Sequence, residues 1–225
     1  MIPARMVKAS VVDLRAGSAP LPKRGIVDAN VLYIVGYDFT SSVTAGLRSP
    51  SPYQIRFYPI WWKKAVQGGV ALCTTAGALA EVAHIIERTE LEILWRTDPR
   101  RPELDPDMPG QDFTPKYIKT VRYHYYSQLQ ALRESVETTL QSIRKLVDVI
   151  PQVGQDASAL DQTLVQWIPS AADFGDAAFV ASAQRTGMRH VISDDADLIS
   201  FEGITVYTAN RSAINAAALA GKLAT

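Results

Sequence analysis

The sequence has few of the residues on which several common chemistries depend. It contains one cysteine, Cys73, so it cannot form an internal disulfide, and the apolar neighbours in GVALC favour a small core side chain over a nucleophile. The three histidines, His84, His124 and His190, are not paired at the spacing of zinc ligands. We therefore expect no disulfide and no zinc site, and any chemistry must depend on carboxylates.

Several glycine-containing motifs and any excess of charge are also absent. The chain has no G-x-G-x-x-G, no G-x-x-x-x-G-K-[ST] and no G-x-S-x-G, so dinucleotide, P-loop and nucleophile-elbow functions have no support. Its 23 basic and 23 acidic residues give a formal net charge of zero. No overall field draws the protein to nucleic acid or to an anionic membrane, so polyanion binding would need a local patch.

Long apolar runs are missing as well. No run approaches the roughly 20 apolar residues that span a bilayer, and the opening MIPARMVKASVVDLRAG lacks the apolar core of a signal peptide. We expect a cytoplasmic protein without membrane contact. With 225 residues, 47% of them apolar, the chain can form one domain, 1–225, that carries a sizeable insertion.

The residues that are present alternate between strand and helix patterns. Apolar runs predict buried strands at 24–29, 70–75, 188–193 and 203–209. Segments with helical periodicity follow or precede them, at 30–38, 53–67, 76–94, 170–187 and 212–224. Thr75 and Ser170 are the expected N-caps of two of these helices, and 40–52 is expected to be a loop. The pattern predicts an α/β fold in three layers, with a mainly parallel central sheet flanked by helices.

A helical insertion at about 96–167 is expected to divide the core into about 24–95 and 168–225. It opens with a proline-rich, charged loop at 96–112, and Thr114-Pro115 begin a helical stretch that reaches Ile150 without glycine or proline. Seven residues, all apolar except Thr139, recur there at spacings of three and four, as in a heptad repeat: Leu129, Leu132, Val136, Thr139, Ile143, Leu146 and Ile150. One helix of this length would extend about 50 Å, so we expect a break, followed by a loop at 151–162.

The insertion also contains the one locally basic segment. Between Phe113 and Leu146 there are six basic residues and two acidic ones. The stretch KYIKTVRYHYY, 116–126, has tyrosines beside lysine and arginine, which is compatible with stacking on nucleic-acid bases. An amphipathic helix that buries its tyrosines and exposes its lysines is the preferred interpretation.

Four carboxylates are predicted to meet at one edge of the sheet. Asp28 ends the first strand, Asp195 follows the strand at 188–193, Asp176 lies early in its helix, and Glu81 lies one to two turns into the helix after the second strand. Ligands of open α/β sheets bind at the carboxyl ends of the strands. Two like charges about 4 Å apart repel by about 4 kcal/mol at an effective dielectric of ~20, so such a cluster needs water or a cation.

These residues resemble the PIN domain, the nuclease fold of many toxins of bacterial toxin-antitoxin pairs. The resemblance rests on IVDANVLYIV, TTAGALAEVAHIIER, DAAFVASAQRTGMRHVISDDADL and GITVYTAN, in that order. It matches Asp28, Glu81, Asp176 and Asp195 to the four acids of the family. Asn30 and Ser193 match its accompanying polar positions, and Asp197 matches an optional further acid.

The resemblance implies a PIN-like three-layer sandwich and a metal-dependent endoribonuclease, as in the toxin of a toxin-antitoxin pair. Mg²⁺ or Mn²⁺, which prefer oxygen ligands, would be held by Asp28, Asp176, Asp195 and Glu81, with Asp197 as a further ligand. Glu81 is alternatively a base for the attacking water. Asn30 and Ser193 would fix the ligands or the phosphate. RNA is the expected substrate, and an antitoxin or a second copy of the chain are further expected partners.

Other interpretations remain for several of these residues. Asp173 is expected to cap its helix rather than bind metal, and Asp194 to be a solvated bystander that points away from Asp195. The heptad-like repeat could pack on the domain itself, on a second copy, or on an antitoxin. The alternative function is a PIN-like module that binds RNA or protein without catalysis. An aspartyl phosphatase is disfavoured because Asn30 stands where a second aspartate would be needed.

Overall fold

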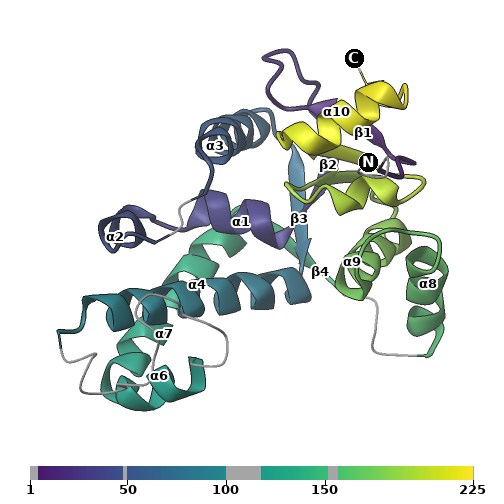
Figure 1. Ribbon diagram of the computed structural model, residues 1–225. Coiled ribbons are helices and arrows are strands. Elements are labelled where there is room, and N and C mark those ends of the chain that lie inside the picture. Colours follow the sequence, from purple (N-terminus) through teal and green to yellow (C-terminus); the bar gives the residue numbers. More distant parts are fainter. Residues whose placement is uncertain (1–4, 48–49, 100–117, 152–156, 225) are drawn as a thin grey trace.

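The computed structural model describes residues 5–47, 50–99, 118–151 and 157–224. In these residues it forms an α/β fold with a seven-stranded sheet in the order β4-β3-β2-β5-β6-β1-β7, and every strand pair is parallel (Figure 1). This confirms the predicted fold class, a three-layer arrangement around a central parallel sheet. None of the helices in the described residues has the length and apolarity to cross a membrane.

The strands are short, with two to five residues each, whereas the helices have up to 22 residues. The strands are β1 (Ser10–Asp13), β2 (Arg24–Val27), β3 (Ala71–Thr75), β4 (Asp148–Ile150), β5 (His190–Ile192), β6 (Thr205–Thr208) and β7 (Leu223–Ala224). The helices are α1 (Ala29–Gly36), α2 (Thr40–Thr44), α3 (Pro52–Gln67), α4 (Ala76–Thr97), α6 (Ile118–His124), α7 (Tyr126–Arg144), α8 (Ala157–Trp167), α9 (Phe174–Arg185), the 3₁₀ turn η2 (Asp197–Ser200) and α10 (Arg211–Leu219).

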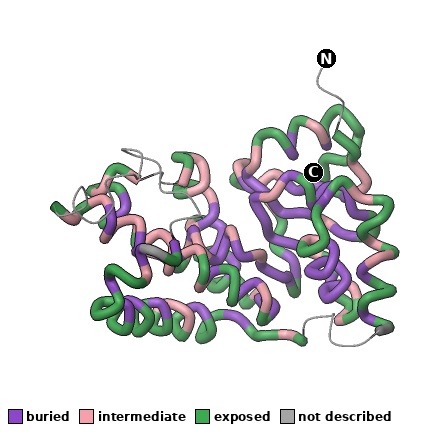
Figure 2. The backbone as a smooth tube through the Cα atoms, turned by 60° about the horizontal axis from the view of Figure 1, so that its bottom comes forward, coloured by how far each residue is buried: buried purple, intermediate pink, exposed green. Residues whose placement is uncertain are grey.

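The predicted strands and most of the predicted helices are present, because their local signals agree with their packing. Strands β2 and β5 bury almost all of their residues, as continuous apolar runs do in a parallel sheet. Figure 2 shows buried residues gathered in the interior of the fold and exposed ones along its outer helices. Thr75 caps α4 as predicted, since its side chain accepts a hydrogen bond from the backbone of Ala78. Cys73 is buried in β3, in agreement with a packing role.

Three strands were not predicted. β1 lies in the segment before residue 24 and pairs with β6, while β7 pairs with β1 at the edge. β4 lies in the supposed helical insertion and pairs with β3. The expectation of helix up to Ile150 is therefore wrong: α7 ends at Arg144, and the chain then enters the sheet. A three-residue strand has too little periodicity to be distinguished from the end of a helix, and its partner strand decides its conformation.

Other local predictions also need correction. The loop expected at 40–52 contains α2 and the start of α3, and the loop expected at 151–162 runs into α8 at Ala157. Helix α9 begins at Phe174 rather than near Ser170, because Asp173 is its N-cap. Gly187, the predicted stop, has a φ of 71°, a conformation that glycine adopts without strain. Thr114-Pro115 and most of the loop at 96–112 lie outside the described residues.

The heptad-like repeat packs on the domain itself. The predicted break lies at Tyr125, between α6 and α7, and α7 packs against α4 and α1. Leu129, Leu132, Val136 and Ile143 are buried in this contact. Leu146, in contrast, is exposed beyond the end of the helix. The repeat is thus accounted for within the chain and gives no support to a coiled coil with a partner.

The strand order reverses between β2 and β5. From β2 the chain moves outward through β3 to β4, and it then crosses back to β5 and β6 on the other side of β2. Right-handed crossovers place α1, α3 and α4 on one face and α8, α9 and α10 on the other (Figure 1). A crevice opens at the carboxyl ends of strands where the order reverses. Asp28 directly follows β2 and Ser193 directly follows β5, so these two residues mark that point.

Candidate active site

Asp28 is held at the end of β2 by hydrogen bonds to both of its carboxylate oxygens. Oδ1 accepts from the backbone of Ala29 at 2.7 Å, which caps α1. Oδ2 accepts from Asn30 Nδ2 at 2.7 Å and from Ser193 Oγ at 2.6 Å. Desolvation raises the pKa of Asp28 to about 6, although the hydrogen bonds from Ser193 and Ala29 lower it.

Asn30 and Ser193, which are predicted to fix the ligands or the phosphate, connect the ends of β2 and β5 by hydrogen bonds. Ser193 is fully buried, and its Oγ accepts from Asn30 Nδ2 at 3.2 Å and from the backbone of Asp195 at 2.9 Å. Asn30 Oδ1 in turn accepts from the backbone of Asp194 at 3.0 Å. The two side chains therefore fix Asp28 relative to the backbone that carries Asp195.

The four predicted acids come within electrostatic range of one another. Desolvation raises the pKa of Asp176 to about 8, and Asp195, Asp173 and Asp28 raise it further by repulsion. Desolvation is also the main cause of the raised pKa of Glu81, to which Asp173 and Asp195 contribute. Acids at the end of β2, in α4, in α9 and after β5 thus lie close enough to repel one another.

The surroundings of Asp195 also raise its pKa. Desolvation raises its pKa most, with further contributions from Asp197 and Asp173, while a backbone hydrogen bond from Asp197 and the charge of Arg5 lower it. That hydrogen bond, from Asp197 N to Asp195 Oδ1, is 2.8 Å long. Asp197 is exposed at the rim of the cluster.

Asp173 has two roles in this geometry. Its Oδ1 accepts from the backbone of Asp176 at 2.9 Å, so it caps α9 as expected. Its charge also raises the pKa values of Glu81, Asp176 and Asp195, so it lies close enough to act on three acids of the cluster. Asp173 therefore caps α9 and is also a member of the acidic cluster.

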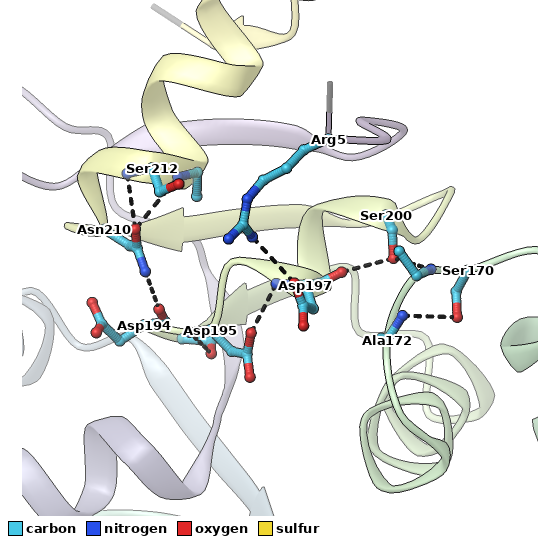
Figure 3. A network of polar contacts seen from close by, with 12 residues as sticks. Arg5, Ser170, Ala172, Asp194, Asp195, Asp197, Ser200, Asn210 and Ser212 are labelled. Atoms are coloured by element: carbon cyan, nitrogen blue, oxygen red, sulfur yellow. Dashed lines mark hydrogen bonds and ion pairs between the residues drawn. The ribbon is translucent and has the colours of Figure 1, made fainter. Parts of the chain in front are cut away.

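The prediction that Asp194 is a solvated bystander is wrong. Asp194 is only 9% exposed, and its carboxylate accepts hydrogen bonds from Tyr53 Oη at 2.9 Å, from Tyr58 Oη at 2.7 Å and from Gln54 Nε2. It does point away from Asp195 (Figure 3), as alternation along the chain requires. The Asp194 side chain points toward α3. Nothing in the sequence indicates that polar side chains of α3 lie beside it.

Arg5 and Lys8, which the sequence analysis did not single out, attach the N-terminal segment to the site. Arg5 Nη1 lies 3.1 Å from Asp197 Oδ1 (Figure 3). Lys8 Nζ donates to the carbonyl oxygen of Pro169 at 2.7 Å, just before α9. Among the ion pairs formed within the described residues, Arg5 is the one Arg or Lys partner of an acid in this cluster. No motif in the sequence indicates either contact.

The chemistry of the candidate ligands suits a hard divalent cation, but their side chains do not converge on one point. All the candidate ligands are carboxylate oxygens, and their pKa values are raised mainly by desolvation and further by mutual repulsion, which a bound cation would relieve. As the side chains stand in the described residues, no three histidine, cysteine, aspartate or glutamate side chains are grouped closely enough to hold a metal ion. The acids would have to rotate toward one another to bind one.

Comparison with known proteins adds no assignment. No protein-family model matches the chain, and no curated protein matches it in sequence.

Proposed function

We propose that this protein is a divalent-metal-dependent ribonuclease of the PIN type. The observation that supports the proposal most is the group of acids Asp28, Glu81, Asp176 and Asp195, which four elements bring together where the strand order reverses. Desolvated acids of one charge that raise one another's pKa values are costly to a fold, and such groups concentrate at functional sites.

Asp28, Asp176 and Asp195 would hold Mg²⁺ or Mn²⁺, with Glu81 as a further ligand and Asp197 in reserve. When bound, the metal would activate a water molecule and stabilise the negative charge that develops on a phosphodiester. Asn30 and Ser193 hold the Asp28 carboxylate in place. In the alternative role for Glu81, its raised pKa suits it to accept a proton from the attacking water.

Cleavage of a labelled single-stranded RNA with and without Mn²⁺ tests the proposal. Wild type should cut the RNA only when metal is present, and Asp28→Asn should not cut it. A single-stranded DNA of the same sequence tests the preference for RNA. Absence of Asp28-dependent cleavage of both substrates would refute the nuclease function.

Metal binding can be tested without any activity measurement. Mn²⁺ at 100 times its dissociation constant should stabilise the folded wild type by about 2.7 kcal/mol, which a thermal shift assay detects. Asp195→Asn should lose most of this shift, while Asp161→Asn, an exposed acid on α8, should keep it. Equal shifts in wild type and Asp195→Asn would favour the alternative, a PIN-like module that binds without catalysis.

A further inference from the structure

The acidic cluster by itself repels a phosphodiester. Its carboxylates act on one another electrostatically, and they belong to Asp28, Glu81, Asp173, Asp176, Asp195 and, at the rim, Asp197. A divalent cation offsets only part of their charge, and each phosphate of a nucleic acid adds a negative charge. A positively charged side chain beside the acids would therefore favour the substrate that the proposed function requires.

Arg5 brings a positive charge to this rim. Its Nη1 lies 3.1 Å from Asp197 Oδ1, and Asp197 N donates to Asp195 Oδ1 at 2.8 Å, so one residue connects the guanidinium to an expected metal ligand (Figure 3). Although desolvation raises the pKa of Asp195, the charge of Arg5 opposes that rise. Arg5 therefore lies within electrostatic range of the place where a substrate phosphate would bind.

The Arg5 guanidinium keeps most of its donors for another partner. Arginine has several N–H groups in a planar fork, which fits a phosphate through two parallel hydrogen bonds. Within the residues that the structure describes, the Arg5 side chain makes one hydrogen bond, from Nη1 to Asp197. The side chains of Arg5 and Asp197 are 42% and 52% exposed. A phosphate can therefore approach the remaining N–H groups while the bond to Asp197 is kept.

The segment that carries Arg5 is fixed to the same 3₁₀ turn as Asp197. The backbone N–H groups of Lys8 and Ala9 donate to the carbonyl oxygen of Ile199, at 2.9 and 3.0 Å. Ile199 lies in η2, which begins at Asp197. Strand β1 follows directly after Ala9. Because the backbone close to Arg5 is already ordered, binding a ligand there costs less conformational entropy.

Asp197 is also held in place for this contact. Its backbone N–H donates to Asp195 Oδ1, and its carbonyl oxygen accepts from Ser200 Oγ at 2.7 Å. Its carboxylate is exposed and bonded to Arg5, in contrast to the desolvated carboxylates of Asp28 and Asp195. These contacts suit a residue that orients a guanidinium better than one that binds a metal ion.

We propose that Arg5 binds a phosphate of the RNA strand beside the metal-binding acids, and that Asp197 positions it. The guanidinium would offset the charge of the substrate and the further negative charge that develops during hydrolysis. The inference rests on the proposed ribonuclease function and deepens it, because it assigns this contact to the charged backbone of the RNA rather than to its bases. It also changes the expected role of Asp197 from a reserve metal ligand to a positioning residue.

Steady-state cleavage of RNA at saturating Mn²⁺ tests the role of Arg5. Arg5→Ala should lower kcat/KM by about 10- to 100-fold, because a hydrogen bond between charged groups is lost. Added guanidinium chloride should restore part of the Arg5→Ala rate in a saturable manner and leave wild type unchanged, a response that loss of structure cannot give. Arg5→Lys, which keeps the charge but not the fork, should fall between Arg5→Ala and wild type.

Arg189→Ala is the matched control. Arg189 is exposed and directly precedes β5, so it lies at the opposite edge of the sheet from Asp195. This variant should cleave RNA like wild type. A fall in kcat/KM equal to that of Arg5→Ala would show that any surface cation serves, which would overturn the assignment to Arg5.

Metal and substrate should respond to Arg5 in opposite directions. Arg5→Ala should bind Mn²⁺ at least as tightly as wild type in calorimetry, while its KM for RNA rises. Asp197→Asn should lower kcat/KM less than Arg5→Ala does and keep the Mn²⁺ affinity of wild type. A loss of Mn²⁺ affinity in Asp197→Asn as large as in Asp195→Asn would identify Asp197 as a metal ligand and refute its positioning role.

A neutral linkage locates the contact on the strand. RNAs with one methylphosphonate in place of one phosphate are compared by fluorescence anisotropy, in an Asp28→Asn background that does not cut. One position near the cleavage site should weaken binding to the chain with Arg5 and have no further effect once Arg5→Ala is added. Unchanged or faster cleavage by Arg5→Ala would overturn the proposal, and in the second case Arg5 would block the site. RNA left uncut by wild type would instead count against the ribonuclease function itself.

Discussion

Ser193 Oγ donates a 2.6 Å hydrogen bond to Asp28 Oδ2 and at the same time accepts one from the backbone of Asp195. One buried hydroxyl thus links two acids that lie 167 residues apart in the chain. Because the hydroxyl rotates to suit its partners, it can hold Asp28 as a hydrogen-bonded anion while a metal binds elsewhere on the carboxylate.

Ser193→Ala should reduce cleavage strongly and stability modestly. The substitution removes a charge-assisted hydrogen bond, so the free energy of unfolding should fall by about 1–3 kcal/mol. The pKa of Asp28 should rise further, because Ser193 lowers it in the wild type. Urea denaturation and NMR titration of the carboxyl group measure the two effects. Ser182→Ala, in the buried middle of α9, controls for loss of a buried hydroxyl away from the site. An unchanged Asp28 pKa would contradict the account.

Asp176 should make the metal-free protein less stable as the pH rises. Its folded pKa of about 8 exceeds its ordinary value of 3.8. Between these pH values Asp176 keeps a proton in the folded chain that it has lost in the unfolded chain. Its contribution to the free energy of unfolding is therefore complete below about pH 4 and is lost as the pH rises past 8. Thermal melts from pH 5 to 9 in EDTA should show a falling midpoint. Asp176→Asn should flatten the curve, and an identical slope in both proteins would argue against the assignment.

Asp194→Ala should destabilise the fold far more than a substitution at the neighbouring exposed acid. It leaves Tyr53, Gln54 and Tyr58 without their shared acceptor, which should lower the free energy of unfolding by more than about 2 kcal/mol. Asp197→Ala removes one surface ion pair and should cost less than about 1 kcal/mol. Urea denaturation of both variants gives the comparison, and equal costs would restore the view of Asp194 as solvated.

Arg5→Ala should tighten the binding of Mn²⁺. The Arg5 charge lowers the pKa of Asp195, so its removal makes the cluster more negative toward a cation. Stability should change by less than about 1 kcal/mol, because the ion pair with Asp197 is exposed. Isothermal titration calorimetry with Mn²⁺ measures the effect, and Arg5→Lys, which keeps the charge, should resemble wild type. Weaker binding in Arg5→Ala would show that Arg5 supports the site in another way.

The sequence alone determined the features whose physical cause is local. Buried apolar runs gave β2, β3, β5 and β6, and caps such as Thr75 gave helix starts, because strand burial and capping depend on neighbouring residues. The rule that ligands bind at the carboxyl ends of parallel strands then sufficed to group Asp28, Glu81, Asp176 and Asp195.

Tertiary structure decided what depends on distant partners. β4 becomes a strand because it pairs with β3, and Asp194 is buried because α3 places two tyrosines and a glutamine beside it. Tyr123 and Tyr126 are exposed because Tyr125 between them is buried and bonded to Asp98. The periodicity of the sequence does not indicate which of these tyrosines is buried. Pairing, burial and ion pairs such as Arg5 with Asp197 join residues far apart in the chain, and so the fold alone specifies them.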